Sequence, residues 1–511
     1  MSIFTSLSNI ANRFRPPPPP PVKTQRAYSA AQINRLTSDW AMAHTSGNAE
    51  LKWGALPIVR SRARDLERNN PLARKFLLMV ETNIVGQSFA LKITSDDPAT
   101  SIVEKAFFSW LDRCDVAGRL SGGDLQRLAV RLTARDGEAF ARLYRDSKLP
   151  DGIGVQLLES DYIPDQVNTD LGMQEVENVM TVMGVILDQY GREIGYHVYD
   201  RHPGDLGYGS TAANISMHTV PASGMIHIFS PERPGQTRAP SWMAASMLSL
   251  KMLDGYREAE LVAARIASCK MGFYKIPPGD DFTADGTTDD GAPTSDAAPG
   301  VFEKMPSGWE FQSFDPTHPA GNFAPFCKEI TRDIANGFGV SYNNLSNDLE
   351  SVNYSSIRAG TIEEREMWKV RQAWFSNAFL RKLYRAWLPM AIQAGTIKLS
   401  AAQQNIFSAS DTWTGRRWDW VDPTKDITAL KMQVDLGITS PSQIAAERGQ
   451  NFAAVTKQIS EDNKARAEAG LPPLGFDKTT LTDTVGSLPD ATPESKPVEK
   501  VVAKPVAKPV E

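Results

Sequence analysis

Apolar residues follow a helical period over 57–85, the first clearly patterned stretch of the chain. Pro57 and Pro71 stand where a first helical turn tolerates proline, and Gly86 follows as a stop signal. A second helix is predicted over 123–135. Both helices precede the first extended stretches, so the amino-terminal half begins with helical structure.

Extended patterns follow these helices. We expect strands at 138–144 and 155–159, and a hairpin within 184–200. In the hairpin, side chains alternate between two faces, and residues 190–193 (Tyr-Gly-Arg-Glu) supply the turn. Helices followed by antiparallel strands indicate the α+β fold class.

Two further helices are predicted beyond the strands. The stretch 241–268 contains no proline and one glycine, Gly255, and would form a helix about 42 Å long. Its apolar residues spread around several sides, so its neighbours must bury it, and those neighbours can belong to other subunits. Residues 326–338 carry an apolar residue at every fourth position, with Gly337 and Gly339 as the end.

The pattern then alternates between polar and helical stretches. Residues 341–356 are rich in Asn, Ser and Asp and are expected to form a loop. A long helix is predicted over 357–388, closed by Pro389, with acidic residues early and basic residues late. Short helices are expected within 424–470.

An acidic stretch lies between the predicted helix that ends at 268 and the one that begins at 326. Residues 276–303 contain no Lys or Arg and few large apolar side chains, which predicts a mobile loop. The spacing of its acids does not meet the register of a calcium-binding EF-hand loop. Its aspartates are Asp280, Asp281, Asp285, Asp289, Asp290 and Asp296.

Both ends of the chain are expected to be tails. Residues 1–25 include six consecutive prolines, 16–21, interpreted as a stiff spacer in preference to a ligand for a proline-binding domain. Residues 476–511 end in a Lys-Pro-Val repeat that cannot bury a core, so disorder is expected there.

Composition narrows the class of protein. A chain of 511 residues suggests two or more structural units. The net charge of −5 disfavours tight, nonspecific DNA binding by the whole surface. Three distant cysteines offer neither a disulfide framework nor a zinc site, which fits a reducing compartment. No apolar run reaches 18 residues, so no membrane span is predicted, and no signal peptide is recognised.

Motifs for chemistry are sparse. No phosphate-binding GxxxxGK[ST] and no GxSxG nucleophile motif is present. A metal-dependent nuclease using Asp136, Glu138, Glu159 and Asp161 remains an alternative, although Asp136-Gly137-Glu138 is better interpreted as a helix end followed by a strand start. The tryptophans are interpreted as packing anchors. We predict no catalytic residue, metal site or cofactor, which favours an assembly protein over an enzyme.

Six segments carry a further signal through their order and spacing. They are NNPLARKFLLMVETNIVG (69–86), WLDRCDVAGRLS (110–121), RDGEAFARLY (135–144), VQLLESDYIP (155–164), IHIFSPERPGQTRAPSW (226–242) and IANGFGVSYNNLSNDLESVNYSSIRAG (334–360). The most specific parts are RPGQ at 233–236 and NYSSIR at 353–358. Over residues 26–475 the chain resembles the portal proteins of tailed bacteriophages, specifically the lambda-like portal family. Ala239 departs from the family pattern, which often has glycine there.

The resemblance implies a portal fold that assembles into a ring of about twelve subunits at one capsid vertex. It divides the chain into named parts. These are an α+β wing (26–240 and 357–420), two stem helices (241–270 and 322–340), a clip between them (271–321), a channel loop (341–356) and a helical crown (421–475).

The resemblance also implies partners and a place in the particle. Double-stranded viral DNA passes through the channel without sequence specificity during packaging and ejection. The terminase large subunit docks on the clip, head-completion proteins replace it, and capsid or scaffold proteins surround the ring. Such a protein belongs to the virion and is assembled in the host cytoplasm, away from membranes. Another ring-forming head–tail connector is an alternative, but such chains are typically much shorter.

Two groups of residues are candidate sites under this resemblance. The acidic aspartates of the clip are candidate contacts for a partner. The channel loop contains no Lys or Arg, which suits weak contact with sliding DNA. Its candidate residues are Asn343, Asn344, Asn347, Asp348, Glu350, Asn353 and Tyr354.

Overall fold

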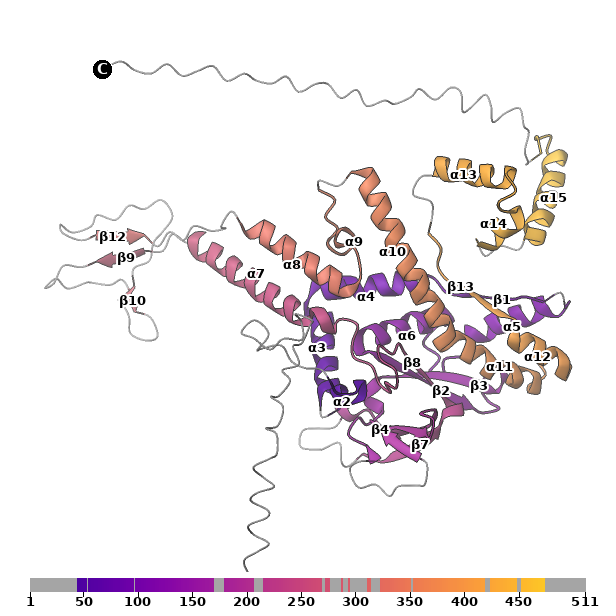
Figure 1. Ribbon diagram of the computed structural model, residues 1–511, viewed down its shortest axis with the longest axis horizontal. Coiled ribbons are helices and arrows are strands. Elements are labelled where there is room, and N and C mark those ends of the chain that lie inside the picture. Colours follow the sequence, from indigo (N-terminus) through magenta and orange to yellow (C-terminus); the bar gives the residue numbers. More distant parts are fainter. Residues whose placement is uncertain are drawn as a thin grey trace, which may run out of the picture. The chain divides into compact units, whose positions relative to one another are not determined.

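The structure is a computed structural model, and its helices and strands are labelled in Figure 1. It describes residues 44–52, 54–95, 97–169, 179–205, 215–268, 272–275, 286–287, 293–294, 310–313, 322–350, 353–418, 423–447 and 452–473. The chain forms two compact units, one up to Arg416 and one from Arg417 onward.

The first helical stretch is confirmed as two helices. Helix α3 covers Ala55–Asn69 and α4 covers Pro71–Val80, continued by a π-helical turn, η2, over Glu81–Val85. Asn70 separates the two helices, because its side chain accepts a hydrogen bond of 2.9 Å from the Ala73 amide at the start of α4. Gly86 ends the stretch with φ of 65°.

Two antiparallel sheets confirm the predicted strands and the α+β class. Figure 1 shows them beside the helices of the first unit. The first sheet has the order β3-β2-β8, the second has the order β4-β5-β6-β7, and β1 pairs separately with β13. The strands are β1 (Ala90–Ile93), β2 (Glu138–Arg145), β3 (Ile153–Leu158), β4 (Val179–Val182), β5 (Val185–Asp188), β6 (Glu193–Tyr199), β7 (Met217–Pro221), β8 (Met225–Phe229) and β13 (Asp411–Thr414).

Aromatic side chains fill the core between α5 (Thr100–Leu111) and α11 (Arg381–Gln393). The rings of Trp110 and Trp387 are both fully buried, with centroids 5.9 Å apart. Trp110 also donates to the Ile153 carbonyl at 2.9 Å, which ties the helix to β3. These tryptophans are packing anchors, as predicted.

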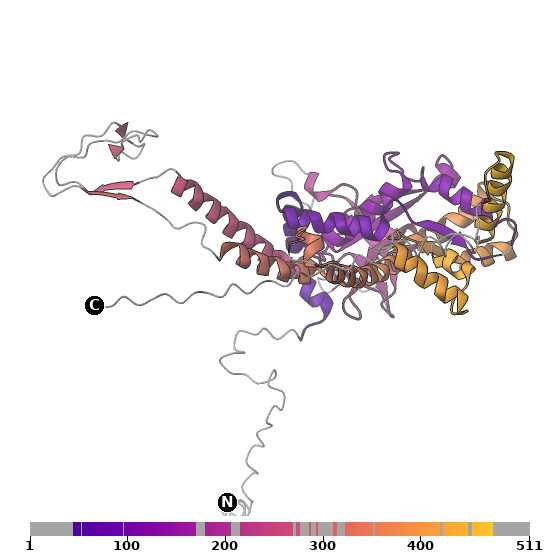
Figure 2. The same cartoon turned by 90° about the horizontal axis from the view of Figure 1, so that it is seen from above.

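The long helix after the strands begins later than predicted. Helix α7 covers Met247–Ser268, and residues 241–246 form turns that include a short 3₁₀ helix, Ala244–Ser246. The partner helix α8 covers Phe323–Phe338 and lies beside α7, as Figure 2 shows. Gly337 does not end α8 but lies inside it. Glycine is needed at this position because a side chain there would collide with Ser246. Gly339, with φ of 70°, is the actual cap.

The expected loop at 341–356 is partly helical. A short helix, α9, covers Tyr342–Ser346, and the next helix, α10, already begins at Tyr354. Polar composition misled the prediction, because these Asn and Ser side chains cap helices as well as form loops.

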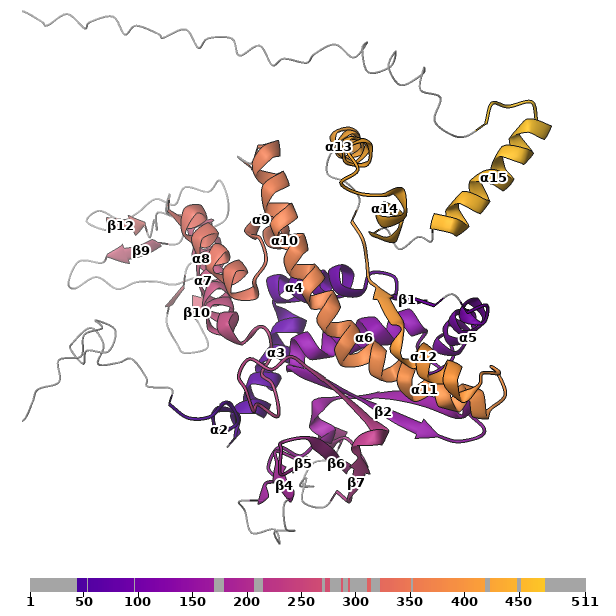
Figure 3. The ribbon, with the colours of Figure 1, turned by 45° about the vertical axis from the view of Figure 1, so that its right-hand side comes forward.

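Pro389 does not close the long helix either. Helix α10 (Tyr354–Phe375) continues through a π-helical turn, η10 (Ser376–Leu380), into α11, which Figure 3 shows as one nearly continuous rod. Trp387 and Leu388 before the proline and Ala391 after it are buried. Packing on both sides outweighs the backbone hydrogen bond that proline removes.

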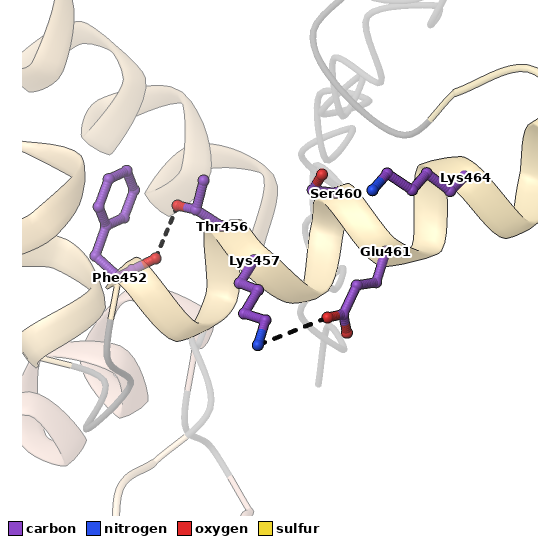
Figure 4. Close-up of a pocket in the computed structure, with 6 residues that line it drawn as sticks. All are labelled: Phe452, Thr456, Lys457, Ser460, Glu461 and Lys464. Atoms are coloured by element: carbon purple, nitrogen blue, oxygen red, sulfur yellow. Dashed lines mark hydrogen bonds and ion pairs between the residues drawn. The ribbon is translucent and has the colours of Figure 1, made fainter. Parts of the chain in front are cut away.

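Helices at the end of the described chain agree with the prediction. They are α13 (Pro423–Asp435), α14 (Pro441–Glu447) and α15 (Phe452–Glu468) in the second unit. Figure 4 shows that the residues around a hollow in this unit all lie along α15, with Lys457 and Glu461 paired one turn apart. The remaining helices of the first unit are α2 (Gly47–Leu51), α6 (Gly122–Asp136) and α12 (Ala401–Ala409).

Short strands occur in the stretch between α7 and α8. Strand β9 (Gly272–Lys275) pairs with β12 (Glu310–Ser313), and β10 (Gly286–Thr287) pairs with β11 (Pro293–Thr294). The predicted loop over 276–303 therefore includes one strand pair. None of the helices in the described residues is long and apolar enough to cross a bilayer.

Candidate functional site: the segment between α8 and α10

The predicted channel loop connects the ends of two helices. Gly339 turns the chain out of α8, α9 follows at once, and Asn353 precedes α10. Figure 3 shows α9 next to both helices, and close contacts join α8 to α9. Side chains from both helices hold this segment.

Glu364 on α10 binds the start of the segment. Its Oε2 accepts hydrogen bonds from the Ser341 amide (3.1 Å), the Ser341 hydroxyl (2.6 Å) and the Asn344 side-chain amide (2.7 Å). Its Oε1 accepts from the indole of Trp368 at 3.0 Å. Glu364 is only 9% exposed, so this carboxylate is a buried and well-satisfied acceptor.

Asp348 binds the other end of the segment to α8. Its Oδ2 lies 2.8 Å from Lys328 Nζ and accepts the Tyr342 hydroxyl at 2.7 Å. Its Oδ1 accepts the Glu350 amide at 3.0 Å. The hydrogen bonds from Lys328, Tyr342 and the Glu350 backbone lower the pKa of Asp348 to about 2. The acid is therefore ionised at neutral pH.

Tyr342 lies at the centre of this contact. Its ring faces two cations of α8, with Lys328 Nζ and the Arg332 guanidinium each 5.6 Å from the ring centroid. Beside it is a hollow of about 730 Å³, whose lining includes Leu72, Arg257, Tyr342 and Glu350.

The seven candidate residues of the channel loop take different roles in the structure. Asn344 and Asp348 bind within the subunit, and Asn353 caps α10 by accepting the Ser356 amide at 2.8 Å. Asn347 and Glu350 present exposed side chains. Asn343 is half-buried in α9, and Tyr354 is the first residue of α10, with a side chain outside the described part.

Sequence reasoning missed Lys328 and Glu364, the two partners of this segment. They lie 20 residues from Asp348 and Asn344, and no local pattern links them. The cap at Asn353 was detectable, because Asn is a favoured N-cap residue and here directly precedes a helical stretch.

The acidic aspartates of the predicted clip, from Asp280 to Asp296, lie outside the described residues.

The four carboxylates of the nuclease alternative lie in an arginine network. Arg64 Nη2 contacts Asp136 at 2.8 Å, Glu159 at 3.3 Å and Asp161 at 2.5 Å. Glu159, Asp161 and His202 offer ligand atoms close enough together to hold a metal ion. Because the guanidinium of Arg64 contacts both acids, it neutralises the charge that a metal would need.

Asp136 and Glu138 confirm the structural interpretation of their motif. Asp136 ends α6, Gly137 caps it with φ of 96°, and Glu138 opens β2. Glu138 is fully buried and accepts from Arg238 Nε at 2.7 Å and from His227 Nε2 at 3.1 Å. Burial raises the pKa of Glu138, but the charge of Arg238 and the contact with His227 outweigh it and lower it to about 2.

The RPGQ motif forms a turn that docks on α2. Arg233 Nη1 lies 2.8 Å from Glu50, and Arg233 Nη2 donates to the Thr45 carbonyl at 2.8 Å. Gln236 Oε1 accepts the amides of Glu232 (2.8 Å) and Arg233 (3.1 Å), which closes the turn. Gly235 adopts φ of 75°, a left-handed conformation that glycine accepts readily.

The first unit is an α+β fold in which α7 and α8 lie side by side and the polar clusters are engaged in internal contacts. The chain belongs to the lambda family of phage portal proteins, whose sequence profile matches residues 34–372. This membership supports a portal function and does not support the nuclease alternative.

Individual relatives agree with the family. The chain is 32% identical over 475 residues to a probable portal protein of Halomonas phage phiHAP-1, covering 90% of each chain. It is 23% identical to portal protein B of Escherichia phage lambda, covering 81% of this chain and 84% of that protein. It is 25% identical to the portal protein of Escherichia phage N15, covering 81% and 85%.

Among solved structures, the neck of an empty gene transfer agent particle aligns with 77% of this chain and 93% of that chain. The sequence identity is 14% and the TM-score is 0.41.

Proposed function

We propose that this portal protein assembles into a closed ring of about twelve copies at one capsid vertex, and that double-stranded viral DNA passes through the ring during packaging and ejection. The observation that carries the proposal is an uncovered apolar seam along α7.

The seam follows the spacing of a helix that packs on another helix. Leu248, Met252, Gly255, Ala259 and Val262 recur at intervals of four and three residues and are all exposed. Leu248 is 72% exposed and Met252 67%. This spacing is that of the a and d positions of a coiled coil, whose apolar side chains pack against a partner helix.

The other side of α7 is already occupied. Leu250 and Leu253 are buried in the subunit, where α7 packs against α3 and α8. A helix with one covered and one uncovered apolar stripe requires a second partner, and another copy of the chain supplies it. A head-to-tail contact of this kind closes into a ring when its rotation angle permits.

The second unit supports the same assembly. The helices α13, α14 and α15 leave large apolar side chains exposed. Among the described residues of this unit, the buried apolar side chain is that of Ala445. Contacts with neighbouring copies in a crown, the proposed role of 421–475, would cover them. The exposed side chains are Ile427, Met432, Leu436, Ile438, Phe452, Ile459 and Leu471.

Weak contact between the channel loop and DNA fits passage. A channel segment of about 40 Å would face roughly 24 duplex phosphates. The loop has no basic residue of its own, and Asp348 neutralises Lys328, the lysine that approaches it. While Asp348 pairs with Lys328, the loop therefore offers no unpaired cation that would grip the backbone and stall movement.

Partners follow from the same proposal. The clip, with its aspartates Asp280 to Asp296, would meet the terminase large subunit and later the head-completion proteins, while capsid or scaffold proteins surround the wing. No cofactor and no catalytic activity are proposed, since the candidate carboxylates of the wing are held by arginines. Assembly would take place in the host cytoplasm before incorporation into the virion.

Imaging the purified full-length chain tests the proposal. We expect rings in end-on negative-stain views and a light-scattering mass of about twelve subunits. A monodisperse monomer under assembly conditions would contradict ring formation. Incubation of the same rings with linear DNA and Mg²⁺ or Mn²⁺ should leave the DNA intact, whereas metal-dependent cleavage would restore the nuclease alternative.

A further inference from the structure

We propose that Glu364 and Asp348 are positioning residues of unequal strength, so that the channel loop can leave α8 while remaining attached to α10. Glu364 acts as a fixed anchor, and the Asp348–Lys328 pair acts as a releasable clasp. The inference rests on the proposed function only in assigning this segment to the DNA channel.

The anchor is strong because it is buried and saturated. Four donors converge on Glu364, and three of them come from Ser341 and Asn344 at the start of the segment. Release would leave a carboxylate that is 9% exposed without its donors. Leaving a buried charged acceptor unsatisfied is costly, so this end stays in place.

The clasp is weak because water reaches both partners. The side chains of Lys328 and Asp348 are 32% and 20% exposed. An ion pair that water can replace contributes little and weakens further as salt is added. The Tyr342 hydroxyl, the third partner, stays half-exposed and can bond to water when Asp348 leaves.

The backbone provides a bend between anchor and clasp. Asn347 adopts φ of 55°, a left-handed conformation uncommon for residues other than glycine, directly after α9. Asp348 and Glu350 border the hollow of about 730 Å³, so the segment has open space beside it. Rotation near Asn347 would therefore move Asp348, Leu349 and Glu350 without unfolding α9.

One contact then couples the stem helix to the loop in both directions. A movement of α8 that shifts Lys328 releases the loop, and cargo that displaces the loop frees Lys328. Coupling between two sites is reciprocal, because each change alters the same equilibrium. In a ring, this arrangement makes the position of each loop sensitive to the state of its stem helix.

Hydrogen exchange in assembled, full-length rings without DNA tests the inference. The amides of 347–350 report on the clasp, and those of 341–346 report on the anchor. We expect Asp348→Asn and Lys328→Met to accelerate exchange at 347–350 by up to about fivefold, the range of an exposed ion pair, and to leave 341–346 unchanged. Added salt should produce the same change in the unmodified protein. Glu364→Gln should accelerate exchange in both regions.

Glu366→Gln is the matched control. It breaks an exposed ion pair with Lys369 (2.6 Å) on the same helix, two residues from Glu364, without touching the segment. If Glu364→Gln prevents folding, Asn344→Ala removes one donor instead and should loosen 341–346. Unchanged exchange in Asp348→Asn and in salt would overturn the clasp, and a response of Glu364→Gln or Asn344→Ala no larger than the control would overturn the anchor.

DNA packaging separates this inference from the proposed function. Faster exchange at 347–350 in Asp348→Asn, together with altered packaging by intact rings, would support both. Faster exchange with normal packaging would support the clasp and contradict the assignment of the segment to the DNA path.

Discussion

Gly137 and Ala239 approach so closely that a β-carbon on Gly137 would lie 2.0 Å from the Ala239 carbonyl oxygen. Gly137 ends α6, and the chain that leads into α7 crosses this end. The Trp242 amide and the Ser241 hydroxyl both donate to the Ala134 carbonyl, at 3.0 and 3.2 Å. The chain that leads into α7 is therefore fixed directly to the end of α6.

Replacing Gly137 should destabilise the fold severely. Gly137→Ala would place a methyl group against the backbone of Ala239 and Pro240 and would force a left-handed conformation. The conformation alone costs about 1 kcal/mol, and with the collision we expect a loss of more than about 3 kcal/mol. Thermal unfolding measures it. Gly360→Ala is the control: this helical glycine has open space around it and should gain about 0.5–1 kcal/mol. Equal midpoints for the two variants would contradict the close approach.

Stability should depend on pH through the buried His227. Its ring nitrogens lie 2.8 Å from Glu193 and 3.1 Å from Glu138. Burial lowers the pKa of His227, but the two carboxylates outweigh burial and raise it above 6.5. The stabilisation from protonated His227 is thus complete below pH 6.5 and is lost as the pH rises through the raised pKa.

His227→Gln tests this dependence. We expect it to cost about 3 kcal/mol at pH 6 and progressively less as the pH is raised through the pKa of His227, because the unmodified protein loses the charge over that range. Thermal or urea unfolding over a pH series measures the difference, with His218→Gln as a control at a partly exposed histidine that pairs with Asp200. The same loss at every pH would show that packing of the ring, and not its charge, is what matters.

The loss of folding stability at low pH should come in part from Glu138. Its pKa is lowered to about 2, so its contribution is complete above pH 4.5 and is lost as the pH falls towards 2. Glu138→Gln should leave Arg238 without its charged partner and lower the unfolding midpoint strongly at pH 7, but little at pH 2. A midpoint difference that does not change with pH would contradict the ionised state of Glu138.

Charge on the α7 seam should block ring formation without unfolding the subunit. Met252→Glu would bury a carboxylate in every subunit interface, where desolvation opposes it. Sedimentation should show folded monomers or small oligomers in place of rings. Leu261→Glu, at a position of the same helix that is 64% exposed but lies outside the spacing of the seam, should still form rings. Rings formed by Met252→Glu would mean that the seam is not the interface.

Added positive charge at the tip of the channel loop should slow DNA passage. Leu349 is 64% exposed and Glu350 is exposed, so Leu349→Lys with Glu350→Lys keeps the Asp348 clasp intact. Each phosphate that becomes paired steepens the salt dependence of binding by about one unit. We expect intact rings, impaired packaging at low salt and recovery at higher salt. Normal packaging at low salt would place the loop away from the DNA.

Local signals in the sequence were sufficient for some of the helices and strands. Helix caps and turns need only neighbouring residues: Pro71 after Asn70 opens α4, Gly86 closes the following turn, and alternation marks β5 and β6. The predicted helix ends at Gly337 and Pro389 were wrong, because contacts with residues distant in the sequence keep the helix intact there. A glycine or proline is a stop signal only if packing does not override it.

The sequence by itself determined the fold class, several of the helices and strands and, through RPGQ and NYSSIR, the family. It did so because periodicity, capping and motif spacing are properties of neighbouring positions. Only the tertiary structure decided that Asp348 binds Lys328, that Asn344 binds Glu364 and that the four carboxylates of the nuclease alternative are held by arginines. Such pairs join residues far apart along the chain. They interact strongly only when folding brings them within hydrogen-bonding distance and removes the water between them.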